Sequence, residues 1–283
     1  MNSSSNSIAV RVPASSANIG PGFDVLGMAL SLHLEAGFGS SPADSIEATQ
    51  NHPVLVAFKH CGGQGPLWVR SQMPMGKGLG FSGAARVAGV SLAHAQKNGS
   101  DEIVFRNAQT ELLAIATELE GHPDNVSASL LGGVVASVAG STVRIPTQLD
   151  PAIIVWVPQE QTSTRESRTK LPTTVSFADA VFNVGRTALL VAALAAGDIS
   201  ALQTATQDRL HQDVRFKKVP ASQAAMLSCI DAGAWCAWLS GSGPTIAAMC
   251  DPADAQNIAD KFPDQGSTMV LRIAAQGAQL LAI

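Results

Sequence analysis

The spacing of apolar and polar residues divides the first part of this chain into segments of strand and helix length. Short apolar runs at residues 8–12 and 67–72 predict two strands, and the second runs directly into a glycine-rich loop. A helix is expected after that loop, over residues 82–97. A strand, a glycine loop and a helix therefore follow one another at this point.

Residues 104–120 predict an amphipathic helix. Its apolar side chains recur at helical spacing, at Leu112, Ile115, Ala116 and Leu119. Glu111 and Glu118 are seven residues apart and share another face. The pattern predicts a helix with an apolar stripe and an acidic stripe. A turn into a strand is expected next, over residues 130–136.

The second half predicts more elements of both kinds but no regular alternation of strand and helix. The expected strands are residues 152–157, 236–239, 245–249 and 268–273, and the expected helices are residues 177–196, 199–211 and 221–232. Such a mixture indicates an α+β fold rather than a doubly wound parallel sheet. We place a domain boundary near residue 150, which gives domains of residues 1–150 and 151–283.

Composition narrows the class of ligand. The net charge of −4 comes from 18 basic and 22 acidic residues, with no run of Lys or Arg that would suit nucleic acid or an anionic membrane. The four cysteines lack the spacing of zinc sites or of a disulfide framework. The first residues contain no signal-peptide pattern, and the apolar run at 188–196 is too short to span a bilayer. We expect a cytoplasmic protein that binds a small molecule, with neither nucleic acid nor a membrane as partner.

The glycines of the loop PMGKGLGFSG, residues 74–83, can be interpreted as a nucleotide-binding loop or as a structural turn. Its letters fit the dinucleotide pattern GxGxxG, but the acids near the required distance, Asp101 and Glu102, precede a helix rather than end a strand. The Walker pattern also fails, because Lys77 stands among the glycines. Backbone N–H groups at the start of the following helix could instead hold a phosphate. A tight structural turn remains the alternative.

Three more polar segments favour the phosphate site over a structural turn. They are PASSANIGPGFD at residues 13–24, ELEGHPDN at 118–125 and SGSGPT at 240–245. In this order, together with the glycine loop, they resemble the GHMP kinases and, within that superfamily, the homoserine kinases. STRESR at 163–168 and DRLHQDVR at 208–215 resemble two further segments of that branch. The resemblance implies a two-domain fold: an N-terminal mixed α/β domain with a left-handed-type βαβ unit carrying the phosphate loop, and a C-terminal ferredoxin-like α+β domain that binds substrate.

The resemblance also implies ATP and Mg²⁺ at the glycine loop. The residues that would line the phosphates are Pro74, Gly76, Lys77, Gly78, Leu79, Gly80, Phe81 and Ser82. Mg²⁺ would be held by Ser82 and Glu118, since the ion prefers hard oxygen ligands and takes only one or two from protein. The alternatives are a solvated helix-face acid for Glu118 and a solvated loop lysine for Lys77.

The acceptor implied by the resemblance is L-homoserine, phosphorylated on its side-chain hydroxyl to O-phospho-L-homoserine in threonine biosynthesis. Asn18, Asp24, Asp124 and Asn125 would surround its hydroxyl and amino ends, and Thr164, Arg168 and Arg215 its carboxylate. An arginine suits a carboxylate because its planar fork donates two parallel hydrogen bonds. Asp124 and Asn125, with Glu118 and Ser82, are the expected catalytic residues, and we expect Asp124 to orient the hydroxyl rather than act as a strong base.

Other readings stay open at this point. The acceptor could be another small hydroxy acid, or the chain a binding homologue with impaired turnover, because Phe81 and Gly83 depart from the family's usual GLGSSAA. Outside the family, the rival is a dinucleotide-dependent oxidoreductase. Trp235 and Trp238 fit a core better than an adenine platform, and SGSGPT is expected to close over the phosphates unless it is a plain hairpin turn. A homodimer is one oligomeric state that stays open.

Overall fold

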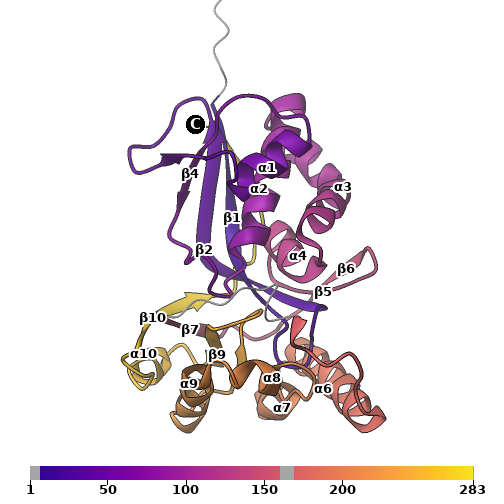
Figure 1. Ribbon diagram of the computed structural model, residues 1–283, viewed down its shortest axis with the longest axis vertical. Helices are drawn as coiled ribbons and strands as arrows, with labels where there is room; N and C mark the ends of the chain where they lie inside the picture. Colours follow the sequence, from indigo (N-terminus) through magenta and orange to yellow (C-terminus); the bar gives the residue numbers. More distant parts are fainter. Residues whose placement is uncertain (1–6, 160–168, 283) are drawn as a thin grey trace, which may run out of the picture.

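The computed structural model describes residues 7–159 and 169–282 and divides into two units, each built on its own sheet (Figure 1). The first sheet has seven strands: β1 (Ile8–Ala17), β2 (Leu26–Phe38), β3 (Ile46–Glu47), β4 (Trp68–Ser71), β5 (Val134–Val138), β6 (Ser141–Ile145) and β11 (Gln279–Ala282). The central path runs β11-β1-β2-β4-β3, while β5 pairs with β2 and β6. All of these pairs are antiparallel.

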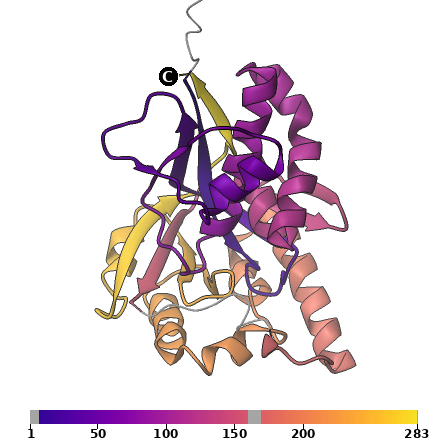
Figure 2. The ribbon, with the colours of Figure 1, turned by 45° about the horizontal axis from the view of Figure 1, so that its top comes forward.

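Helices α1 (Pro53–His60), α2 (Phe81–Asn98), α3 (Glu102–Glu120) and α4 (Pro123–Leu131) lie together on one side of this sheet (Figures 1 and 2). Small residues make α2 the central helix of the layer, and 11 of its residues are buried. Gly89 lets α1 approach closely, because a Cβ there would lie 2.3 Å from the Val54 carbonyl oxygen. Asp101 caps the start of α3, and Gly121 ends it in a left-handed conformation.

The second unit holds a four-stranded antiparallel sheet of β7 (Ala152–Pro158), β8 (Cys236–Leu239), β9 (Ile246–Cys250) and β10 (Gly266–Arg272). Its helices are α6 (Phe177–Ala196), α7 (Ile199–Ala205), α8 (Gln212–Phe216), α9 (Pro220–Asp231) and α10 (Ala255–Ala259). The strand order β10-β7-β9-β8 places the first strand between the third and the fourth, which is the ferredoxin-like arrangement expected. Every residue of β7 is buried, as its unbroken apolar run predicts.

The expected α+β architecture is therefore confirmed, with some differences in extent. The helix expected over residues 199–211 ends at Ala205, and α8 follows separately. Helix α4 was not expected, and only its last two residues, Leu130 and Leu131, lie where the turn into a strand was predicted. Strand β11 pairs with β1, with Ala282 opposite Ile8, so the end of the chain returns to the first sheet instead of staying in the second unit.

Helix α6 is long and apolar enough to cross a membrane by length and composition alone, with a mean hydropathy of 1.4. It belongs to the helix layer of the second unit and packs along α7 (Figure 1). Leu190, Ala193 and Leu194 are buried there, while Phe177 and Val184 are exposed.

Candidate functional site

The glycine-rich loop joins the end of β4 to the start of α2 and borders a cavity of about 140 Å³. All eight residues expected to line the phosphates lie around this cavity: Pro74, Gly76, Lys77, Gly78, Leu79, Gly80, Phe81 and Ser82. Its other lining residues are Glu120, His122, Asn125, Gly241 and Ser242. The first N–H groups of α2 have no partner within the helix, so this end of α2 can bind an anion.

Two glycines of the loop sit where no other residue would fit. Gly80 caps α2 at φ 67°, and a Cβ there would lie 2.0 Å from Ser15 Oγ. Gly78 has φ 83°, and its Cβ would lie 2.3 Å from the Ser240 carbonyl oxygen. The glycines therefore allow β1 and the SGSGPT turn to approach the loop. Among the described residues, β4 pairs antiparallel with both of its neighbours, β2 and β3. It therefore has no adjacent parallel strand of the kind that the βαβ unit of a dinucleotide-binding fold requires, and that reading is wrong.

The SGSGPT turn joins the paired strands β8 and β9 and lies against the glycine loop, and hydrogen bonds hold the turn and the loop together. Ser240 Oγ donates to the Gly78 carbonyl at 2.6 Å, which uses its one proton. In the hydrogen bond between Ser240 and Ser16, whose Oγ atoms are 2.8 Å apart, Ser16 is therefore the donor. Trp238 Nε1 in turn donates to Ser16 Oγ at 2.9 Å. Trp238 is fully buried, which confirms its expected place in the core. This chain of donors fixes the loop from behind.

Lys77 points away from the loop toward the second unit. Its Nζ donates to the carbonyl oxygens of Pro158 at 2.8 Å and Gln159 at 2.6 Å, and the residue is buried. Lys77 thus ties the glycine loop to the end of β7. The solvated loop lysine considered from the sequence is therefore wrong.

The carboxylate beside Ser82 belongs to Glu120 and not to Glu118. Ser82 Oγ donates to Glu120 Oε2 at 2.7 Å, and Glu120 lines the cavity, whereas Glu118 is exposed and does not. Two residues along an α-helix correspond to a rotation of roughly 200°, so the two side chains leave α3 on opposite faces. The expectation that Glu118 shares a site with Ser82 is thus corrected to Glu120.

Ser82 and Glu120 offer a set of donors that fits Mg²⁺. Both side chains present oxygen atoms. The hydroxyl of Ser82 donates its hydrogen bond to the carboxylate of Glu120, so the lone pairs of the serine oxygen stay free. Over residues 7–159 and 169–282, no group of three or more His, Cys, Asp and Glu side chains could hold a metal by itself. Mg²⁺ requires only one or two protein ligands when phosphates and water supply the others.

Asp124 and Asn125 open α4 next to the glycine loop. Asp124 is buried, and its Oδ1 accepts from the Asn125 N–H at 2.8 Å and lies 3.6 Å from His122 Nδ1. Asn125 Oδ1 accepts from Ser15 Oγ at 2.8 Å, and Asn125 borders the cavity. The two expected residues are thus anchored at the cavity's edge, with Asn125 facing it and Asp124 behind.

The expected acceptor residues of the two units converge on one carbonyl oxygen. Asn18 Nδ2 and Arg215 Nη1 both donate to Gly241 O, at 2.7 and 2.9 Å. Asn18 Oδ1 accepts from the Asp24 N–H at 3.0 Å, and both residues have positive φ, 71° and 57°. Such backbone conformations cost energy for residues other than glycine, and they concentrate at functional sites. Thr164 and Arg168 lie outside the described residues.

His211 contacts the expected site residue Arg215, although the sequence assigned no role to this histidine. Its Nε2 lies 2.8 Å from the Gly20 carbonyl, which can only accept, so Nε2 carries the proton. Nδ1 then accepts from Arg215 Nη1 at 3.0 Å. Burial lowers the pKa of His211 from 6.5 to about 4, so the ring is neutral near pH 7. It holds Arg215 in place and is not poised as a general base.

Asp208 fixes the backbone that carries this histidine. Its carboxylate accepts from the N–H groups of His211 at 2.9 Å and Gln212 at 2.7 Å, and from Asn183 Nδ2 at 2.7 Å. Burial alone would raise the pKa of Asp208, but the neighbouring His211 and these donors outweigh it and hold that pKa below its usual value. His211 and Arg215 are four residues apart in the DRLHQDVR segment, and this helical spacing was the signal in the sequence.

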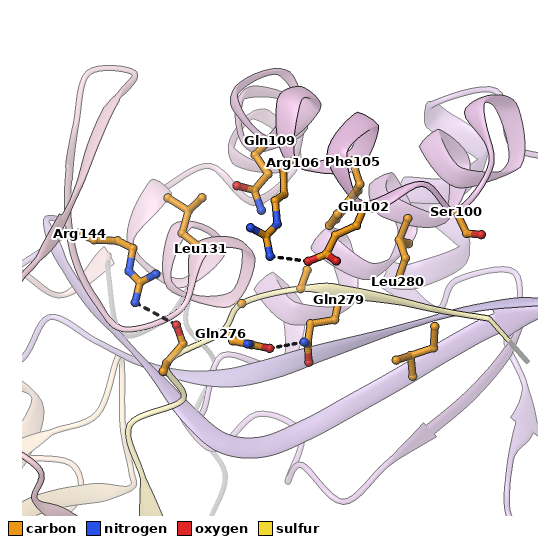
Figure 3. Close-up of a pocket in the computed structure, with 14 residues that line it drawn as sticks. Ser100, Glu102, Phe105, Arg106, Gln109, Leu131, Arg144, Gln276, Gln279 and Leu280 are labelled. Atoms are coloured by element: carbon orange, nitrogen blue, oxygen red, sulfur yellow. Dashed lines mark hydrogen bonds and ion pairs between the residues drawn. The ribbon is translucent and has the colours of Figure 1, made fainter.

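A second hollow, of about 480 Å³, lies between α3 and the segment that ends in β11 (Figure 3). Arg106 pairs there with Glu102, and Arg144 Nη2 donates to the Ala275 carbonyl oxygen at 2.9 Å. None of the expected site residues lines it. Within the described part of the chain, the eight expected loop residues and Asn125 border the glycine-loop cavity, whereas Asn18, Asp24, Asp124 and Arg215 do not line it.

Comparison with known proteins agrees with this geometry. Residues 51–133 match the GHMP kinases N terminal domain, and residues 190–268 match GHMP kinases C terminal. The homoserine kinase of Caldanaerobacter subterraneus subsp. tengcongensis is 38% identical over 274 residues, covering 89% of this chain and 86% of that protein. The homoserine kinase of Streptomyces avermitilis is 36% identical and covers 98% of this chain and 96% of its own.

A solved structure extends the likeness to the whole fold. The crystal structure of homoserine kinase from Cytophaga hutchinsonii superimposes with a TM-score of 0.85 at 27% identity, covering 99% of both chains. The two-domain arrangement expected from the motifs is thus confirmed. The chain belongs to the homoserine kinase family of the GHMP kinases.

Proposed function

We propose that this protein transfers the γ-phosphoryl group of ATP to the side-chain hydroxyl of L-homoserine, giving ADP and O-phospho-L-homoserine, in threonine biosynthesis. The observation that carries the proposal is the convergence of Asn18 and Arg215 on Gly241, which itself borders the glycine-loop cavity. An amino-acid pocket and a phosphate pocket would then share one wall.

The glycine loop would hold the phosphates of ATP through backbone N–H groups at the start of α2, with the positive end of the helix dipole behind them. Phe81 keeps its N–H although it lacks the usual hydroxyl. Its ring packs edge-on against His52 at 5.8 Å between centroids, so it has a partner of its own. We therefore take the departures at Phe81 and Gly83 as compatible with turnover.

Ser82 and Glu120 would hold Mg²⁺. When bound, the ion neutralises negative charge on the phosphates. Phosphoryl transfer leaves little covalent work to the protein, so the side chains act by positioning. Ser82 and Glu120 fix where the phosphate end lies, and the buried network behind Gly78 prevents the loop from moving away.

Arg215 would bind the carboxylate of the acceptor together with Arg168, and Thr164 would add a weaker contact. Asn18, Asp24 and the pair Asp124 and Asn125 would then hold the amino and hydroxyl ends. Asp124 Oδ1 already accepts from the Asn125 N–H, which suits a carboxylate that orients the hydroxyl better than one that removes its proton. These roles follow from the family motifs, and the contacts above are consistent with them.

A coupled assay for ADP with a panel of small alcohols tests the proposal. We expect L-homoserine to give a kcat/KM at least about tenfold above L-serine, L-threonine and mevalonate, because a site built for a particular hydroxyl and carboxylate discriminates by one or more hydrogen bonds. A preference for mevalonate would favour a kinase for another hydroxy acid. Binding of ATP without any turnover would favour an impaired homologue.

We also propose that the enzyme acts in the cytoplasm as a homodimer. Phe177, Val181 and Val184 lie on one exposed face of α6, and Phe177 is 86% exposed. An apolar face of this kind suits a two-fold contact with a second copy. Light scattering at micromolar concentration tests this, since a mass of 29.1 kDa would show a monomer and contradict the proposal.

A further inference from the structure

Arg86 makes a contact with the proposed metal carboxylate that no motif assigns. It lies four residues after Ser82, one turn along α2, so both side chains leave the same face of the helix. Arg86 Nε and Ser82 Oγ both donate to one atom, Glu120 Oε2, at 2.5 and 2.7 Å. Glu120 therefore has two donors from one helix on a single oxygen.

These two hydrogen bonds decide which atoms are left for a metal. A carboxylate can accept about four hydrogen bonds or ligands, two on each oxygen. Among the described residues, both hydrogen bonds to Glu120 reach Oε2, so Oε1 keeps its lone pairs. Ser82 directs its proton to Oε2, so its own lone pairs stay available too. The pair is preset with two free oxygen donors.

Arg86 approaches the carboxylate from outside the cavity. Ser82 and Glu120 both line the 140 Å³ space, but Arg86 does not. Its side chain is 23% exposed and that of Glu120 is 10% exposed, so the ion pair is largely shielded from solvent. A shielded charge-assisted hydrogen bond is stronger than a neutral one and fixes geometry. Arg86 is thus placed to orient the carboxylate rather than to touch the phosphates.

We propose that Arg86 is the positioning residue of the metal site: it fixes Glu120 Oε2 together with Ser82, so that Glu120 Oε1 and Ser82 Oγ face the metal. The inference rests on the proposed function, because the metal site is part of it. Partners that orient a metal ligand in this way affect metal affinity far more than they affect the binding of distant groups.

The test compares Arg86→Met and Arg86→Lys with a matched control, Arg106→Met. Arg106 also pairs with a glutamate of α3, Glu102, but that pair is exposed and lies away from the glycine loop. Binding of Mn²⁺ in the presence of a non-hydrolysable ATP analogue is measured by electron paramagnetic resonance. The Mg²⁺ concentration for half-maximal kinase activity and the KM of L-homoserine are measured beside it, and circular dichroism checks folding.

We expect Arg86→Met to weaken Mn²⁺ binding and raise the half-maximal Mg²⁺ concentration about tenfold, while the KM of homoserine stays within about twofold. Arg86→Lys should recover part of the loss, and Arg106→Met should match the parent. Unchanged metal binding in a folded Arg86→Met, or tighter binding, would overturn the inference, since tighter binding means that Arg86 competes with the metal.

Glu120→Gln separates this inference from the proposed function. If Glu120→Gln shifts metal binding and Arg86→Met does not, the metal site stands and the role of Arg86 fails. If neither variant shifts it, the assignment of the metal to Glu120 fails, and the role of Arg86 fails with it. If both shift it but homoserine is not phosphorylated, the metal site and the role of Arg86 stand while the proposed activity fails.

Discussion

Replacing His211 by glutamine should remove a defined part of the acid sensitivity of this protein. The pKa of His211 falls from 6.5 to about 4 on folding, because the ring is buried. Between these values the unfolded chain binds a proton that the folded chain does not, so stability falls as pH drops from 6.5 to 4. One pKa unit corresponds to about 1.4 kcal/mol, so the full difference is about 3 kcal/mol. Glutamine can still donate to Gly20 O but does not titrate.

Urea unfolding of both proteins at intervals between pH 7.5 and 4.5 measures this. Other histidines with pKa values lowered by burial, His33, His52 and His94, contribute equally to both proteins and cancel in the difference. We expect the free energy of unfolding of the parent to fall more steeply than that of His211→Gln below pH 6.5. Parallel curves would show that His211 is not held neutral and would refute the arrangement around Arg215.

Three further predictions concern turnover. Glu120→Gln should lower kcat by about a hundredfold and Glu118→Gln by less than about twofold, because only Glu120 faces the phosphate end; equal effects in steady-state assays would contradict the placement. Ser82→Ala should cost at least about tenfold in kcat through the metal, whereas Phe81→Ser should stay within about tenfold of the parent. An inactive parent rescued by Phe81→Ser would instead mean a degraded phosphate site. Arg215→Ala should raise the KM of homoserine roughly 10- to 150-fold, which corresponds to about 1.5–3 kcal/mol, and leave the KM of ATP nearly unchanged. Equal losses for both substrates would indicate misfolding.

The choice between Glu118 and Glu120 shows what the sequence could have told and did not. Leu112 and Ala116 are both buried, and Glu120 continues the same row four residues later. The apolar stripe therefore pointed to Glu120 as the acid nearest the core. Glu118 shares a face with Glu111, which is exposed. The resemblance assigned the metal to Glu118 by its distance along the sequence from Asp124, and that distance does not show which face of the helix the acid occupies.

Other features depend on contacts that no local pattern encodes. Strand β11 pairs with β1, which lies at the other end of the sequence. The four residues of β11 contain no pattern that indicates a partner so distant in the sequence. The sequence placed Lys77 within the glycine loop. It could not show where the side chain points, because that is set by the carbonyl oxygens at the end of β7. By contrast, the eight loop residues that the motifs grouped together all border one cavity, since glycines and short polar side chains cluster where backbones approach closely.

The most direct test of the proposed activity is product identification by ³¹P NMR after incubation with ATP, Mg²⁺ and L-homoserine. We predict one O-phospho-L-homoserine for each ADP formed, with the resonance of a phosphate monoester, and loss of both products in Glu120→Gln but not in Glu118→Gln. ADP and inorganic phosphate without a phosphomonoester, or a phosphomonoester formed from another alcohol in preference to homoserine, would contradict it.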